Sequence, residues 1–255
     1  MTPRLPLIID AHEDLAWNML TFGRDYTRSA LETRRGELGS PAPQHNGDTL
    51  LGWPEYQRGR VALVFSTLFV APARRKLGDW DTQHYATDAE AHTLYHQQLD
   101  AYHRLTDEHP HLYRLVQTRP DLQAVLEHWQ RPDTEEHPVG LVVLMENAEG
   151  VHPPADLEEW WAGGVRIIGP AWAGTRYCGG TREPGPLTPL GYTLLDRMAE
   201  YGFVLDLSHM DAQAALQALD RYPRQVIVSH GNALALLPGS TSNRHLPDEI
   251  GRAHV

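Results

Sequence analysis

Histidine and acidic side chains recur where apolar runs end in this sequence of 255 residues. LIIDAHED contains His12 and Asp14, VVLMENAE contains Glu146, and the runs FVLDLSHM and QVIVSHGN contain His209 and His230. Imidazole and carboxylate groups together suit zinc or a similar first-row ion. Because five such groups exceed what one four-coordinate ion needs, the set predicts two ions that share a bridging carboxylate. Paired ions can hold a hydroxide between them and polarise a carbonyl, which is hydrolytic chemistry.

The spacing of the first three groups supports this interpretation. His12 and Asp14 are two residues apart in a predicted strand, so both side chains point to the same face and can hold one ion. Glu146 follows five apolar residues, where a carboxylate is costly unless a cation or hydrogen bonds neutralise it. Glu149 is the alternative, and we prefer Glu146 because it adjoins the strand. In the structural alternative, each histidine is a buried, hydrogen-bonded core residue.

Apolar segments and amphipathic segments alternate along the chain, which predicts how these groups are positioned. We expect strands at 7–14, 61–70, from about 139, and within 165–172, 203–210 and 225–232. We expect helices at about 88–107, 121–129, 188–201 and 211–220, and a surface excursion over 24–55. Strands that are apolar on both faces and alternate with helices indicate a parallel sheet covered by helices.

This alternation predicts an α/β fold of the (β/α)8 TIM-barrel type, in which catalytic groups gather at the carboxyl ends of the strands. A doubly wound sheet is the alternative, but no glycine-rich turn follows the first strand. About six strands can be placed before Gly231, whereas a closed barrel needs eight. We therefore expect residues 1–255 to form a single metal-dependent hydrolase barrel domain that lacks the last two strand-helix units. Such a domain is either truncated at its carboxyl end or completed by another chain, as in a homodimer.

In this order, the motifs resemble the membrane dipeptidase (renal dipeptidase-like) family of zinc metallopeptidases. IIDAHEDLAW resembles its opening strand, QLDAYHRLTDEHPHL its long helix, and GGVRIIGPAWAG, LTPLGYTLLDRMAEYGFVLDLSHM and VIVSHGNALALLPGSTSNRHLPDEI continue the match. The resemblance implies an amidohydrolase-like barrel with two Zn²⁺ ions. It further implies the metal ligands, with Glu146 as the bridging catalytic carboxylate: His12 and Asp14 on the first ion, His209 and His230 on the second.

The resemblance also implies two substrate-binding positions. Arg244, in NRHLPDEI, matches the arginine that holds the terminal carboxylate of the substrate, a role that suits a planar guanidinium. Trp172 stands where better-studied relatives carry a histidine thought to contact the substrate, and an indole cannot accept a proton. The family's last strands supply an aspartate that this sequence lacks.

The predicted function is therefore a zinc-dependent dipeptidase that hydrolyses dipeptides through a metal-bridging hydroxide. Two alternatives stay open at this point. Trp172 allows another amide or lactone hydrolase on the same scaffold, and the missing strands allow a metal-binding fragment without catalysis.

Composition restricts the partners and the location. A net charge of -11 disfavours nucleic acid, and no apolar run approaches the roughly 18 residues that span a membrane. A lone cysteine, Cys178, excludes an internal disulfide, and we expect a cytoplasmic protein. We expect Cys178 to be a bystander, and His92 and His96, four residues apart in a polar helix, to face solvent.

Overall fold

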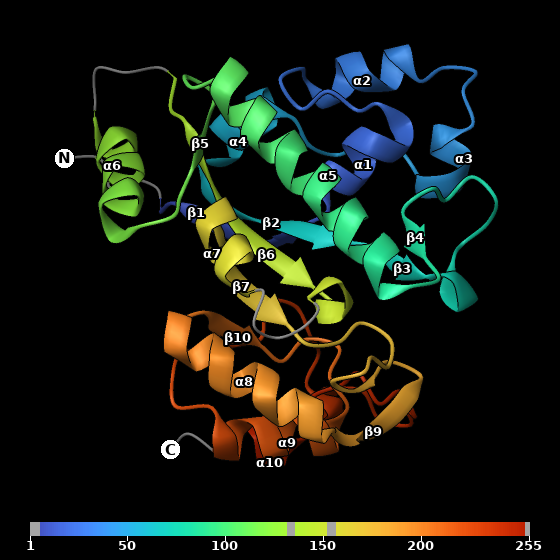
Figure 1. Ribbon diagram of the computed structural model, residues 1–255. Helices are drawn as coiled ribbons and strands as arrows, with labels where there is room; N and C mark the ends of the chain where they lie inside the picture. The colour runs from blue at the N-terminus through green and yellow to red at the C-terminus, as the bar shows by residue number, and fades with distance from the viewer. Residues whose placement is uncertain (1–5, 132–135, 152–156, 253–255) are drawn as a thin grey trace. The chain divides into compact units, whose positions relative to one another are not determined.

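The computed structural model describes residues 6–131, 136–151 and 157–252 (Figure 1). Its contacts divide the chain into two compact units. The first unit holds residues 1–66 and 98–142, and the second holds residues 67–97 and 143–255. The boundaries between the units fall inside three elements, which are β2 (Val61–Phe69), α5 (Asp88–Glu108) and β6 (Val139–Glu146).

A parallel sheet provides the frame for the predicted ligands. Its strand order is β1-β2-β6-β7-β10-β11, and β5 also pairs with β6. The bounds of the remaining strands are Ile8–Glu13 for β1, Tyr113–Leu115 for β5, Val165–Gly169 for β7, Val204–Asp206 for β10 and Val226–Ile227 for β11. The order follows the chain without the reversal that defines a doubly wound sheet. The sheet is that of a partial (β/α)8 barrel, which confirms the predicted fold class.

In the first unit, helices precede β2 and flank β5. They are α1 (Leu15–Phe22), α2 (Ala30–Gly36), α3 (Ala42–Asn46), α4 (Trp53–Gly59) and α6 (Arg119–Gln130). The buried Tyr56 and Tyr113 rings meet edge to face at 6.5 Å in its core. Edge-to-face packing of this kind fixes α4 against β5.

The segment 24–55 differs from the expected excursion, because it contains α2, α3 and the start of α4. Ser29 begins α2 with a capping box, in which its hydroxyl accepts from the Glu32 amide. The buried Arg24 guanidinium donates to Glu37 at 2.7 Å and to the Gly47 carbonyl at 2.7 Å. Local capping and a buried ion pair thus order a segment whose polar composition suggests a loop.

In the second unit, helices alternate with β7, β10 and β11. They are α7 (Leu157–Gly163), α8 (Pro189–Tyr201), α9 (Ala212–Arg221) and α10 (Asp248–Arg252). Short strands β3 (Ala71–Pro72) and β4 (His84–Tyr85) pair in parallel, and β8 (Cys178–Gly180) and β9 (Glu183–Leu187) form an antiparallel pair. Thr188 caps α8 at its start, and Gly202 ends it in the left-handed conformation. These turn residues bring the chain back to β10.

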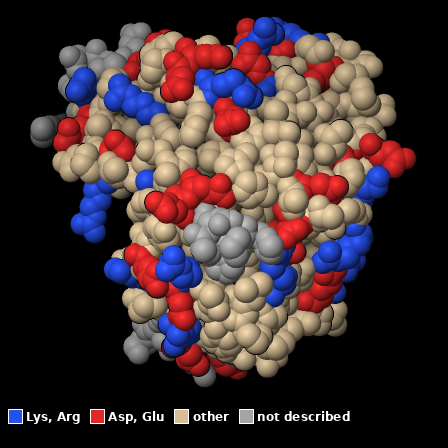
Figure 2. Space-filling view, viewed as in Figure 1, with Lys and Arg blue, Asp and Glu red and all other residues tan. Residues whose placement is uncertain are grey.

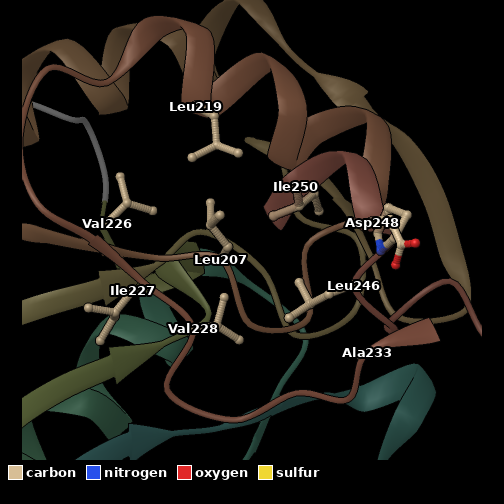
Figure 3. A pocket seen from close by; sticks show the side chains of 10 residues that line it. Leu207, Leu219, Val226, Ile227, Val228, Ala233, Leu246, Asp248 and Ile250 are labelled. Carbon is tan, nitrogen blue, oxygen red and sulfur yellow. The ribbon is translucent and has the colours of Figure 1, made fainter. Parts of the chain in front are cut away.

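Beside the last strand of the sheet lies an apolar pocket of about 540 Å³ (Figure 3). Leu219 of α9, Val226 and Ile227 of β11 and Ile250 of α10 contribute to its walls. Separately, none of the helices among the described residues combines the length and the apolar character needed to cross a membrane. The cytoplasmic location remains a prediction.

Candidate metal centre

Three of the predicted ligands meet at the carboxyl ends of strands in the second unit. Glu146 is the last residue of β6, His209 follows β10, and His230 follows β11. The Glu146 Oε1 atom lies 2.9 Å from His209 Nε2 and 3.6 Å from His230 Nε2. The two Nε2 atoms lie 2.7 Å apart. The side chains are mostly buried, with exposed fractions of 6% for Glu146, 5% for His209 and 24% for His230.

The backbone at the ends of β6 and β10 departs from regular geometry. Asn147 and His209 adopt positive φ angles of 75° and 66°, a conformation that L-residues rarely take. The buried Tyr95 hydroxyl donates to the carbonyls of Glu146 at 2.9 Å and Asn147 at 2.5 Å. A buried hydroxyl therefore holds the turn that aims Glu146, and strain of this kind is typical of functional sites.

A buried carboxylate that sequence reasoning overlooked organises both Ser-His segments. Asp206 is 1% exposed, and its Oδ1 atom accepts from the Ser208 amide at 3.0 Å, the Ser208 hydroxyl at 2.7 Å and the Ser229 amide at 3.0 Å. The Ser229 hydroxyl donates to Asp206 Oδ2 at 2.5 Å and lies 3.0 Å from His230 Nδ1. The Ser208 hydroxyl accepts from the His230 amide at 3.1 Å. The repeated Ser-His pair after two apolar runs is the signal that could have revealed this network.

His209 is oriented by the turn between β8 and β9. The Thr181 hydroxyl lies 2.9 Å from His209 Nδ1, and the Thr181 amide donates to the Trp172 carbonyl at 2.9 Å. The ring of Trp172 lies 6.1 Å from the His209 ring and 5.2 Å from that of Phe69. In metal sites, a partner on one ring nitrogen fixes the other nitrogen as the ligand atom.

The donor set fits a resident metal ion. The Nδ1 atoms of His209 and His230 both face hydroxyls, which leaves both Nε2 atoms directed at one carboxylate oxygen. Two ring nitrogens 2.7 Å apart beside a buried carboxylate form a compact N,N,O set of the kind that zinc prefers.

The first unit holds the remaining two predicted ligands. His12 Nε2 lies 3.7 Å from Asp14 Oδ1, and the His12 amide donates to Asp10 at 3.1 Å. Glu13, between them in the chain, is buried and accepts a hydrogen bond from Tyr56. Burial raises the pKa of Glu13 to about 9.

The two predicted substrate-binding residues line one pocket with His209. The pocket measures about 270 Å³, and Trp172, Thr181 and Arg244 contribute to its walls. Arg75 also lines it and donates to Glu183 at 3.0 Å. The structure therefore places a guanidinium, an indole and a candidate metal ligand around one space.

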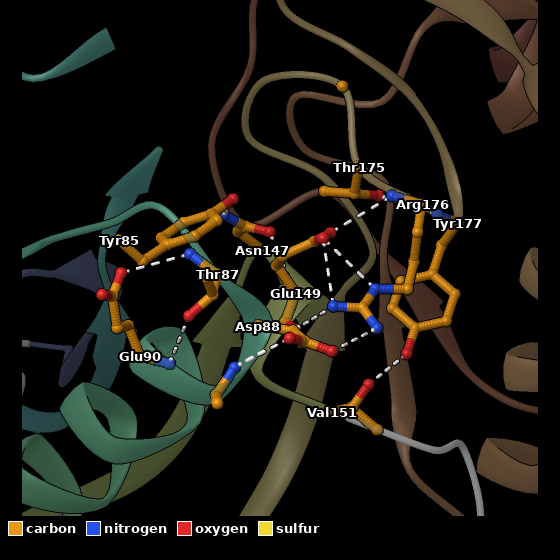
Figure 4. A network of polar contacts seen from close by, with 12 residues as sticks. Tyr85, Thr87, Asp88, Glu90, Asn147, Glu149, Val151, Thr175, Arg176 and Tyr177 are labelled. Atoms are coloured by element: carbon orange, nitrogen blue, oxygen red, sulfur yellow. Dashed lines mark hydrogen bonds and ion pairs between the residues drawn. The ribbon is translucent and has the colours of Figure 1, made fainter. Parts of the chain in front are cut away.

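Glu149, the alternative to Glu146, has a different setting (Figure 4). Its carboxylate accepts from the Arg176 amide at 3.1 Å and from the Arg176 guanidinium at 3.2 Å. The same guanidinium donates to Asp88 at 3.0 Å. Glu149 is thus engaged in an ion pair, whereas Glu146 faces the two histidines.

One face of the molecule carries surface charges of both signs. On the face drawn in Figure 2, basic and acidic side chains are interspersed rather than gathered into a basic tract.

Comparison with known proteins adds a family and several relatives. A family model described as membrane dipeptidase, peptidase family M19, matches residues 4–252. Dipeptidase tcpJ of Claviceps purpurea (strain 20.1) is 25% identical over 202 residues, which are 76% of this chain and 43% of that protein. An uncharacterised protein in the pqqA 5' region of Klebsiella pneumoniae is 30% identical over 129 residues, which are 47% of this chain and 46% of that protein. The chain thus spans less than half the length of these two curated relatives.

Solved structures show the same fold. A metallopeptidase from Rhodobacter sphaeroides, liganded with a phosphinate mimic of the dipeptide L-Ala-D-Ala, aligns with a TM-score of 0.71 and 18% identity, and the match covers 97% of this chain and 70% of that one. The probable dipeptidase PvdM from Pseudomonas aeruginosa aligns with a TM-score of 0.67 and 20% identity over 82% of this chain and 51% of that one.

Proposed function

Because this chain belongs to the membrane dipeptidase family of metallopeptidases, we propose that it is a zinc-dependent dipeptidase. The observation that carries the proposal is the convergence of Glu146, His209 and His230 beside a pocket that Arg244 lines. The substrate class follows from the family and from the relatives described as dipeptidases. We also propose that residues 1–255 form one hydrolase domain, because β2, β6 and α5 each contribute residues to both units.

The proposed ligands of two Zn²⁺ ions are the five residues that the family resemblance implies. Glu146, His209 and His230 would hold metal in the second unit, with Glu146 as the bridging carboxylate, and His12 and Asp14 would supply the other ligands. This division rests on the family resemblance and on the strand-end positions of all five side chains. When bound, the ions would activate a water molecule and polarise the carbonyl of the scissile bond.

The protein's own side chains orient the substrate and the ligands. Arg244 would pair with the terminal carboxylate of the dipeptide through two parallel N–H donors, which fixes the position of the peptide bond. Thr181 and Ser229 would keep the two imidazoles in the orientation that presents Nε2. Trp172 supplies an apolar wall to the pocket.

A hydrolysis panel tests the function. The zinc-loaded chain is assayed with dipeptides and with N-acyl lactones, alongside Glu146→Gln, which keeps the side-chain shape and removes the charge. We expect dipeptide hydrolysis by the wild type, at least about a hundredfold less by Glu146→Gln, and recovery of wild-type activity when zinc is restored after chelation. Lactone hydrolysis without dipeptide hydrolysis would contradict the proposal.

Trp172 favours a second candidate function, another amide or lactone hydrolase on the same scaffold. Its indole lines the pocket beside His209 and cannot take up a proton. The same panel separates the two candidates, and Trp172→His shows whether this position sets the substrate preference. Zinc binding without hydrolysis of any substrate would instead identify a metal-binding chain that lacks catalysis.

A further inference from the structure

A second group of metal-type side chains, on α5 and α7, shares no residue with the candidate centre. His92 and His96 lie one helical turn apart on α5, and Glu159 lies on α7. The Glu159 Oε1 atom is 2.8 Å from His92 Nε2, and its Oε2 atom is 3.5 Å from His96 Nε2. Each residue offers one ligand atom, and the three atoms lie within 4.8 Å of one another. All three residues belong to the second unit.

The sequence alone predicts that these histidines face solvent, and the structure shows side chains that are partly exposed and that also face one carboxylate. The side chains of His92 and His96 are 33% and 37% exposed, and both face the same carboxylate. The spacing His-x-x-x-His is visible in the sequence. Glu159 lies 63 positions after His96, and no sequence motif connects the two residues. Tertiary packing therefore adds a third ligand to a pair that would be unremarkable alone.

Trp160 holds the two imidazole rings in place. Its fully buried indole stacks on the His96 ring at 4.4 Å and meets the His92 ring edge-on at 5.3 Å. The two imidazoles are themselves 4.5 Å apart between ring centroids. Packing against one rigid surface restricts the rotation of both rings before any ligand binds. A site whose ligands are already oriented loses less conformational entropy on binding.

We propose that His92, His96 and Glu159 bind one divalent first-row cation, with zinc as the best match, and that this ion clamps α5 to α7. Two imidazole nitrogens and a carboxylate oxygen are a ligand set that zinc accepts, with bond lengths of about 2.0–2.2 Å. Ligand atoms around a tetrahedral ion with such bonds lie roughly 3.3–3.6 Å from each other. The distances of 2.8 Å from Glu159 to His92 and 3.5 Å from Glu159 to His96 are near this range. Because the ligands are partly exposed, water can complete the coordination.

The site differs from a catalytic helix motif. The string HTLYH lacks the glutamate that follows the first histidine in His-Glu-x-x-His, so it offers no general base of that type. The rival interpretation is an ion-free cluster in which His92 and His96 donate to Glu159. In that interpretation the three side chains contribute a hydrogen bond and an ion pair, and added zinc has no effect on them.

Zinc binding to the full chain distinguishes these interpretations. Equilibrium dialysis against free Zn²⁺ compares the wild type with His92→Gln/His96→Gln and with Glu159→Gln. His103→Gln, on the same helix, is the matched control. We expect the wild type and His103→Gln to bind one more equivalent than the double variant. Glu159→Gln should bind that equivalent at least about tenfold more weakly, since even the loss of an outer partner of a metal ligand costs this much.

A thermal measurement gives an independent readout. Zinc is added to wild type whose candidate metal centre already holds zinc. The added zinc should raise Tm, because an ion that binds only the folded state stabilises that state. The double variant should show no such rise. Equal zinc equivalents in the wild type and the double variant would overturn the proposal, and so would a loss in His103→Gln as large as that in the double variant. None of these outcomes depends on dipeptide hydrolysis, so failure of the proposed function leaves this test intact.

Discussion

The Nε2 atoms of His209 and His230 lie 2.7 Å apart at the ends of two neighbouring parallel strands. Each histidine follows a serine, and both serines bond to the buried Asp206 carboxylate. The pairing of β10 with β11 therefore does more than extend the sheet by one strand. It brings two identical Ser-His pairs into register around one anion and directs both imidazoles at Glu146.

The Thr181 hydroxyl is expected to orient His209 through Nδ1. Thr181→Val removes the hydroxyl and keeps the side-chain volume, so the zinc affinity of the centre should fall by about 10- to 100-fold. Thr181→Ser keeps the hydroxyl and should retain affinity within a few-fold. Competition with a chromogenic chelator measures the Kd of each variant. Equal affinities for the valine and serine variants would show that the contact has no orienting role.

Asp206 is expected to contribute to stability as well as to the centre. Asp206 is 1% exposed, and its carboxylate accepts hydrogen bonds from two amides and two hydroxyls. An asparagine side chain offers only one acceptor oxygen for these four donors. Asp206→Asn should lower the free energy of unfolding by about 1–3 kcal/mol. Urea denaturation measures this value, with Asp220→Asn at an exposed position of α9 as the control. Equal losses in both variants would argue against the network.

Arg244 should act on one chemical group of the substrate. Arg244→Ala should lower kcat/KM for a dipeptide by about 10- to 150-fold, mainly through KM, because a charged hydrogen-bonded pair contributes about 1.5–3 kcal/mol. The corresponding dipeptide amide lacks the carboxylate, so Arg244→Ala should lower kcat/KM for the amide much less. Steady-state kinetics on both substrates give the comparison. A similar loss on the amide would place Arg244 outside carboxylate recognition.

Cys178 should be inert in the folded protein. Burial raises the pKa of its thiol from 9.0 to about 12, and the side chain is 2% exposed. A thiol with a raised folded pKa stabilises the folded state fully below pH 9 and loses that contribution as pH rises towards 12. Because the thiolate is the form that reacts, a buried thiol with a raised pKa is a poor nucleophile. An aromatic disulfide reagent at pH 8 should react much faster with Cys178 after unfolding in urea than with Cys178 in the native chain. Equal rates would contradict the burial of the thiol.

Regular elements were predictable from the sequence because apolar periodicity decides them. The structure confirms α5 and α8 nearly to their ends, and β1, β2 and β6 begin within one residue of their predicted positions. Parallel strands place their carboxyl ends together, so the meeting of Glu146, His209 and His230 also followed from the pattern.

Other features depend on contacts between distant parts of the chain. Thr181 reaches His209 across 28 residues, and Glu159 meets His92 across 67 residues. No short sequence motif marks Thr181 or Glu159 as a partner of these histidines. The helices within 24–55 were missed because the buried Arg24–Glu37 pair and the Ser29 cap order a segment whose composition resembles a loop. Periodicity reports which face of an element is buried, but not which polar side chains meet there.

Metal content after removal of ligand side chains tests most directly whether Glu146, His209 and His230 form a metal centre. The wild type, His209→Ala, His230→Ala and the control His103→Ala are loaded with zinc, dialysed against metal-free buffer to retain tightly held metal, and analysed for zinc by elemental analysis. His209→Ala and His230→Ala should each lose most of one zinc equivalent together with dipeptide hydrolysis, while His103→Ala should match the wild type. Wild-type zinc content in both histidine variants would contradict the assignment.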